Sequence, residues 1–222
     1  MTIRAKICGI RSERDLRIAV EAGADAVGFI CGVTHVSEDA LEADHAAELS
    51  RRTPPFVTRV LVTHLADATE IIALADQIGV DVIQVHGLVT DETVRRVHAQ
   101  ARGRKVLCAV HVIGPDAIGA ARRVAANCDG VLLDSRTAER LGGTGETHDW
   151  SISAKIVRAL REIGRPVILA GGLDPGNVAA AIEAVRPGVV DVNSGVETPA
   201  GDKDAAACAA FVNAAHGAEP RR

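Results

Sequence analysis

The chain has 222 residues, 47% of them apolar and 24% charged, and 25 basic residues against 29 acidic ones give a formal net charge of −4. At about 150 residues per domain this length favours a single domain, which we expect over residues 1–216, followed by a flexible tail at 217–222. The negative charge and an aromatic content of 2% argue against a nucleic-acid-binding surface.

Cysteine usage and the N-terminus indicate the compartment. None of the five Cys residues forms a C-x-x-C motif, which favours a reducing cytoplasm over a secreted, disulfide-bonded fold. The N-terminus is too short and too charged for a signal peptide, and no apolar run approaches the roughly 20 residues of a membrane span. We therefore expect a cytoplasmic protein without membrane or nucleic-acid partners, either a monomer or a homodimer.

Short apolar runs alternate along the chain with longer stretches of helical periodicity. The runs predict eight strands, at residues 3–8, 26–31, 57–63, 81–86, 105–111, 130–134, 166–170 and 189–193. The periodic stretches predict helices at residues 14–22, 67–78, 91–101, 116–126, 153–163, 177–185 and 204–214. Ser12, Asp91 and Asp116 are the expected capping residues of three of them.

The strand runs are almost continuously apolar, which is typical of parallel strands buried on both faces. Strand–helix units of about 28 residues, repeated eight times, predict an α/β fold with a single eight-stranded parallel (β/α)8 TIM barrel. A doubly wound open sheet is the alternative. Its dinucleotide-binding form is disfavoured because no G-x-G-x-x-G motif follows the first strand.

In a barrel of this kind the chemistry lies where the strands end. Cys8 ends the first predicted strand, where a thiol can act as base or nucleophile, or simply be a small buried residue. Asp134 ends the sixth, where a carboxyl can act as a general acid, cap a helix or pair with a neighbouring loop.

Glycines follow the last three predicted strands, at residues 142–145, at Gly171-Gly172 and at Gly195. Backbone N–H groups without side chains in front of them bind phosphate, and the loops after the last two strands are its usual place in such barrels. Ordinary tight turns also need glycine. We expect a phosphate site here.

Taken in order, these motifs resemble the phosphoribosylanthranilate isomerase family almost from end to end. The resemblance is carried by Lys6-Ile7-Cys8-Gly9-Ile10, Gly23-Ala24-Asp25-Ala26-Val27-Gly28-Phe29, Pro54-Pro55-Phe56-Val57, Gln84-Val85-His86-Gly87, Leu133-Asp134-Ser135, Gly142-Gly143-Thr144-Gly145, His148-Asp149-Trp150, Ala170-Gly171-Gly172-Leu173 with Asn177-Val178, and residues 190–197. It implies a tryptophan-biosynthesis enzyme that catalyses, without a cofactor, the Amadori rearrangement of an N-(5-phosphoribosyl) aromatic amine.

The resemblance also implies residue roles. Cys8 would be the general base and Asp134 the general acid, and Asp191 would contact the sugar or serve as a buried structural carboxylate. The partner is a small phosphosugar, whose 5′-phosphate would be held by Gly143, Gly145, Gly171, Gly172, Ser194 and Gly195.

The loop after the second strand departs from the family. The family has an Arg there that pairs with the anthranilate carboxylate, whereas residues 29–50 contain no Arg or Lys and carry Glu38 and Asp39 at that place. Either another basic residue binds the carboxylate or the substrate lacks it. A third interpretation is that residues 37–39 cap the following helix.

Histidines mark the second departure. His35, His64, His86 and His111 follow four successive strands, and only His86 belongs to the family pattern. With Asp39 we expect them to bind substrate and expect no metal. The alternative is that they converge on a divalent metal, with Asp39 or Glu38 as carboxylate.

Three functions remain open. The first is phosphoribosylanthranilate isomerase itself. The second is a paralogous phosphosugar isomerase or epimerase with a different aglycone, with or without a metal. The third, a non-catalytic phosphosugar-binding protein, is disfavoured because both proposed catalytic residues are present.

Overall fold

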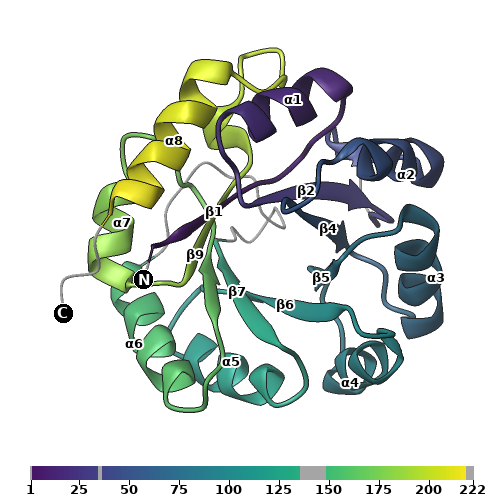
Figure 1. Ribbon diagram of the computed structural model, residues 1–222. Coiled ribbons are helices and arrows are strands. Elements are labelled where there is room, and N and C mark those ends of the chain that lie inside the picture. Colours follow the sequence, from purple (N-terminus) through teal and green to yellow (C-terminus); the bar gives the residue numbers. More distant parts are fainter. Residues whose placement is uncertain (1, 35–36, 136–148, 219–222) are drawn as a thin grey trace.

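The computed structural model describes residues 2–34, 37–135 and 149–218. Within them, parallel strands form a closed barrel of eight, and helices ring it on the outside (Figure 1). The ring closes because β1 (Arg4–Ile7) pairs in parallel with both β9 (Val189–Val192) and β2 (Ala26–Cys31). This closure confirms the predicted TIM barrel and excludes the open sheet.

All eight barrel strands lie inside the predicted ranges. The other five are β4 (Thr58–Thr63), β5 (Val82–Val85), β6 (Lys105–His111), β7 (Gly130–Asp134) and β8 (Val167–Leu169). A further two-residue strand, β3 (Ala40–Leu41), pairs with the end of β2 outside the barrel.

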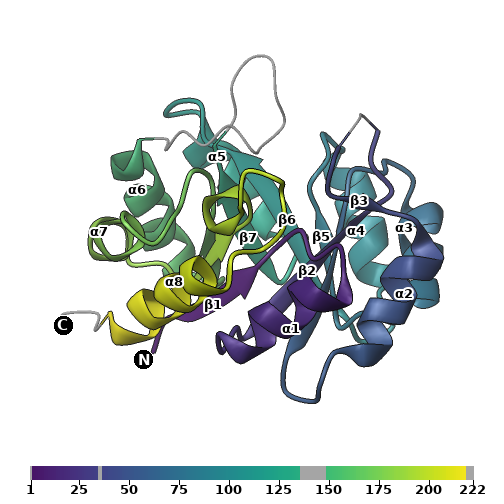
Figure 2. The same ribbon diagram turned by 90° about the horizontal axis from the view of Figure 1, so that it is seen from above.

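The helices are α1 (Glu13–Glu21), α2 (Ala43–Arg52), α3 (Ala68–Ile78), α4 (Asp91–Gln100), α5 (Ala117–Ala125), α6 (Trp150–Arg161), α7 (Val178–Val185) and α8 (Ala205–Gly217). Figure 2 shows them lying against the outside of the strands. In the described part of the chain, no helix combines the length and apolarity needed to cross a membrane.

Helix α2 is absent from the sequence-based prediction. Its buried face is built from Ala46, Ala47, Leu49 and Ser50, so only one large apolar residue marks it in the sequence. Of the expected caps, Ser12 accepts a hydrogen bond from the Asp15 backbone N–H.

The other two caps differ from expectation. Thr90, not Asp91, caps α4, and the Asp116 side chain makes no capping hydrogen bond.

The side chains of each strand alternate between the two faces of the sheet, and this alternation decides which residues face the site. Ala5 and Ile7 of β1 are fully buried in the layer between strands and helices, whereas Cys8 belongs to a separate small cluster with Ile30 and Val60. Because successive side chains of a strand point to opposite faces, even-numbered residues of β1 face the barrel interior. Polar groups on these inner positions form the site.

Candidate active site

Cys8 stands just past the end of β1, in contact with a buried ion pair. Lys6 Nζ donates to Asp191 Oδ2 at 2.8 Å across the β1–β9 pairing, and the exposed fractions of the two side chains are only 3% and 7%. Burial lowers the pKa of Lys6, but the interactions with Asp191 and Cys8 together outweigh burial and hold this pKa above its usual value. Lys6 is therefore a fixed cation beside the thiol.

The thiol of Cys8 is poorly ionised in the free protein. Burial raises its pKa, the Lys6 ammonium opposes this, and the Asp191 carboxylate adds to it. Gly28 on β2 makes room for the arrangement, because a Cβ there would lie 2.7 Å from Cys8 Sγ and 3.1 Å from Lys6 Cε.

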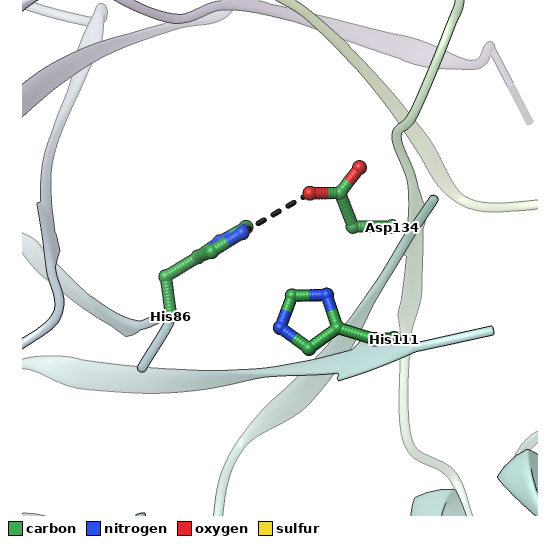
Figure 3. Close-up of side chains that lie close together, drawn as sticks. All are labelled: His86, His111 and Asp134. Atoms are coloured by element: carbon green, nitrogen blue, oxygen red, sulfur yellow. Dashed lines mark hydrogen bonds and ion pairs between the residues drawn. The ribbon is translucent and has the colours of Figure 1, made fainter. Parts of the chain in front are cut away.

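A second buried cluster lies at the ends of β5, β6 and β7. His86 Nε2 lies 3.1 Å from Asp134 Oδ2, and His86 Nδ1 lies 3.1 Å from Gln84 Nε2. The amide of Gln84 donates to Nδ1, so Nε2 carries the proton that is donated to the carboxylate. His111 points toward the same carboxylate in Figure 3.

Asp134 is an ionised carboxylate in this setting. Burial acts to raise its pKa, but the hydrogen bond from His86 and the electrostatic interactions with His86 and His111 hold the pKa below its usual value. The ring of His64 lies edge-on to His86, with centroids 5.4 Å apart, and His111 stands 5.5 Å from His86 in the same way. Three of the four predicted histidines thus lie together.

The acidic loop contacts Asn193 and Arg11. Asp39 accepts from Asn193 Nδ2 at 2.8 Å and lies 3.8 Å from Arg11 Nε, and Arg11 Nη1 reaches the Glu38 backbone oxygen at 3.4 Å. Neither acid accompanies the histidines, so the carboxylate beside them is Asp134 instead. The expected capping role for residues 37–39 is also wrong, because α2 begins only at Ala43.

The predicted phosphate loops follow β8 and β9. Gly171 and Gly172 adopt φ of 84° and 65°, and within the described chain their N–H groups donate to no backbone acceptor. Ser194 and Gly195 belong to a short 3-10 helix, η1 (Ser194–Val196). Packing also requires glycine at position 171, since a Cβ there would overlap the backbone nitrogen of Ser135.

Three predicted site residues, His35, Gly143 and Gly145, lie outside the described residues.

Several residues at the site were not predicted to belong to it. Lys6 and Gln84 lie two positions before Cys8 and His86 on inner strand faces, and a polar residue inside an apolar run was the available signal. Lys203 is fully buried and donates to Asn193 Oδ1 at 2.7 Å and to Glu197 Oε1 at 2.6 Å. No local pattern distinguishes it from a surface lysine.

Comparison with known proteins gives relatives over nearly the whole chain. The family model described as N-(5'phosphoribosyl)anthranilate (PRA) isomerase matches residues 5–214. The chain is 43% identical over 220 residues to the N-(5'-phosphoribosyl)anthranilate isomerase of Natronomonas pharaonis, which covers 97% of this chain and 99% of that protein.

Solved structures agree with these sequence relatives. The phosphoribosyl anthranilate isomerase of Thermotoga maritima is 36% identical, with a TM-score of 0.84 over 97% of this chain and 99% of that one. A phosphoribosyl anthranilate isomerase in complex with reduced 1-(o-carboxyphenylamino)-1-deoxyribulose 5-phosphate is 33% identical, with a TM-score of 0.81 and the same coverage.

Proposed function

The chain belongs to the N-(5'-phosphoribosyl)anthranilate isomerase family, and we propose that it catalyses the Amadori rearrangement of N-(5-phosphoribosyl)anthranilate to the 1-amino-1-deoxyribulose 5-phosphate. One observation carries the proposal: two buried ionisable clusters face the interior of one barrel, Cys8 with Lys6 and Asp134 with His86. Their strands, β1 and β7, are separated around the ring by β9 and β8. A base and an acid can therefore act on opposite sides of one small sugar.

The proposed steps use only these two groups. Asp134 gives a proton to the ribose ring oxygen, and the ring opens to a Schiff base. The Cys8 thiolate removes the proton from C2′, which leaves an enolamine. The enolamine gains a proton at C1′ and loses its hydroxyl proton, so the product is an isomer of the substrate.

In the free protein, neither Cys8 nor Asp134 is in the protonation state that these steps require. Burial keeps Cys8 as a thiol, and His86 keeps Asp134 as a carboxylate. One proton passing from Cys8 to Asp134 through solvent prepares the first turnover, and the same transfer resets the site afterwards. Lys6 stabilises the Cys8 thiolate during the reaction, because its ammonium lowers the pKa of Cys8 more than the ammonium of Lys203 does.

We place the 5′-phosphate at the ends of β8 and β9, on the backbone of Gly171, Gly172, Ser194 and Gly195, together with Gly143 and Gly145. The left-handed pair Gly171-Gly172, whose N–H groups have no backbone acceptor among the described residues, supports this assignment.

Arg11 is our candidate for the aglycone carboxylate. It follows Cys8 by three residues, its side chain is 22% exposed, and its contacts to Asp39 and Asp202 are long, at 3.8 and 3.4 Å. A substrate carboxylate can therefore compete for the guanidinium. A charged hydrogen bond contributes roughly 1.5–3 kcal/mol, and since Asp39 and Asp202 compete, we expect Arg11→Gln to lower kcat/KM about tenfold.

Arg14→Gln is the matched control. Arg14 also pairs with Asp202, at 3.6 Å, but its side chain is 62% exposed, and we expect no change in kcat/KM. Equal losses in the two variants would show that the effect arises through Asp202 and would remove Arg11 from the substrate site.

The test of the function is a fluorescence assay of the purified protein with phosphoribosylanthranilate. We expect turnover that Cys8→Ser and Asp134→Asn each abolish. Turnover of other phosphoribosyl amines alone would favour the paralogue. Phosphosugar binding without any turnover would favour the non-catalytic protein, and unchanged turnover in both variants would refute the mechanism.

A further inference from the structure

We infer that His86, His111 and Asp134 form a binding site for one divalent transition-metal ion of the zinc type, which the isomerisation does not use and which inhibits it. Each residue offers one ligand atom, and the three atoms lie within 4.8 Å of one another. The inhibitory part of the inference rests on the proposed role of Asp134, whereas the binding part stands on geometry alone.

The spacing suits a small ion. Ligand atoms about 2.0–2.1 Å from a tetrahedral zinc ion are about 3.3 Å apart from one another. His86 Nε2 and Asp134 Oδ2 already stand 3.1 Å apart. His111 faces them from the neighbouring strand β6, whose last residue pairs in register with Asp134 (Figure 3). A small side-chain movement therefore completes three ligands.

The donor set selects the class of ion. Two imidazoles and one carboxylate suit zinc and its neighbours, whereas magnesium and calcium prefer oxygen ligands throughout. Three protein ligands leave a fourth position for water, as in open zinc sites. All three side chains come from strand ends, and strands hold ligands more rigidly than loops do.

Gln84 supplies the outer support that such a site needs. Metal binding at His86 Nε2 moves the ring proton to Nδ1, which then requires an acceptor. The Gln84 side chain already lies 3.1 Å from Nδ1, and its buried Oε1 has no hydrogen-bond partner among the described residues. Turning the amide over places Oε1 against the Nδ1 proton, so rotation of one amide supplies the acceptor that the metal-bound tautomer requires.

Occupation of the site removes a catalytic group. A carboxylate bound to a metal ion cannot carry the proton that Asp134 is proposed to give to the sugar ring. We therefore expect zinc to inhibit turnover and a chelator to restore it.

Binding is tested by titrating the metal-free protein with zinc in a calorimeter, without substrate. We expect one ion per chain, and a loss of at least about tenfold in affinity in His111→Gln and in Asp134→Asn. His98→Gln is the matched control, because His98 is a surface histidine outside the cluster, and its affinity should equal that of the unmodified protein.

Cobalt substitution identifies the ligands. We expect visible bands of a nitrogen- and oxygen-bound ion and no thiolate-to-metal charge-transfer band. A thiolate band, no saturable binding, or unchanged affinity in both cluster variants would each overturn the site.

Inhibition is measured separately with phosphoribosylanthranilate. Saturable zinc binding without inhibition would overturn the inhibitory role alone. Absence of turnover in the metal-free protein would instead refute the proposed function, while the calorimetric result would still decide the metal site.

Discussion

Lys6→Met removes the cation of the buried pair beside Cys8. The Lys6 and Asp191 side chains are 3% and 7% exposed and joined at 2.8 Å, so Lys6→Met leaves an uncompensated carboxylate in the barrel interior. Removing one partner of such a pair costs about 3–5 kcal/mol, whereas replacing both with apolar residues is often close to neutral. We expect Lys6→Met to be strongly destabilised in urea unfolding and Lys6→Met/Asp191→Leu to recover most of the loss.

The same pair governs the pH dependence of kcat/KM. The active form has Cys8 as a thiolate and Asp134 protonated, and it holds the same number of protons as the thiol–carboxylate form. We therefore expect kcat/KM to stay level through the neutral range and to fall above the raised pKa of Cys8, where the proton needed on Asp134 is lost. Lys6 lowers this pKa and Asp191 raises it. Lys6→Met should therefore move this falling limb to higher pH, and Asp191→Asn should move it to lower pH.

Shifts of the pH profile in opposite directions are the decisive result. Both single variants should lose stability, and a loss common to both would not move the two profiles in opposite directions. The assay is the pH profile of kcat/KM at low substrate concentration, together with circular dichroism to confirm folding at each pH. Shifts in the same direction, or a profile that neither substitution moves, would refute the role of Cys8 as the titrating base.

Two further changes test the surroundings of the site, and a third tests an exposed ion pair on α4. Gly28→Ala should cost about 1–3 kcal/mol and lower kcat, because its Cβ would stand 2.7 Å from Cys8 Sγ; urea unfolding and the turnover assay measure the two effects. Lys203→Met should lose about 3–5 kcal/mol, since it leaves the Glu197 carboxylate without its fully buried partner, seen as a lower urea midpoint. Arg95→Ala removes an exposed pair and should change stability by less than about 1 kcal/mol, measured in the same way.

The barrel itself could be predicted because its signal is local. Each strand, such as 26–31, is a short apolar run, and several helices begin at a recognisable capping residue such as Ser12. Helix α2 was missed because Leu49 is its one large apolar residue, so the segment does not stand out as an apolar stretch.

The sequence alone also identified Cys8, Asp134 and the glycine pairs as candidates, because the end of a strand in such a barrel is a defined place. It could not say which groups they meet. Lys6 and Asp191 are 185 residues apart in the chain, and Asp134 is 48 from His86. Only the pairing of strands in the barrel brings them within hydrogen-bonding distance, since β1 pairs with β9 and β6 pairs with both β5 and β7.

Sequence thus determined the architecture and the kinds of chemical group at its rim, because strand periodicity and strand-end position are properties of short segments. Tertiary structure decided the protonation of those groups: burial and a neighbouring charge set the pKa of Cys8 and of Asp134 in opposite directions. It also placed Arg11 beside the acidic loop, because β1 and β2 are neighbours in the closed ring. Charge effects depend on distance through space, and no spacing along the chain encodes that distance.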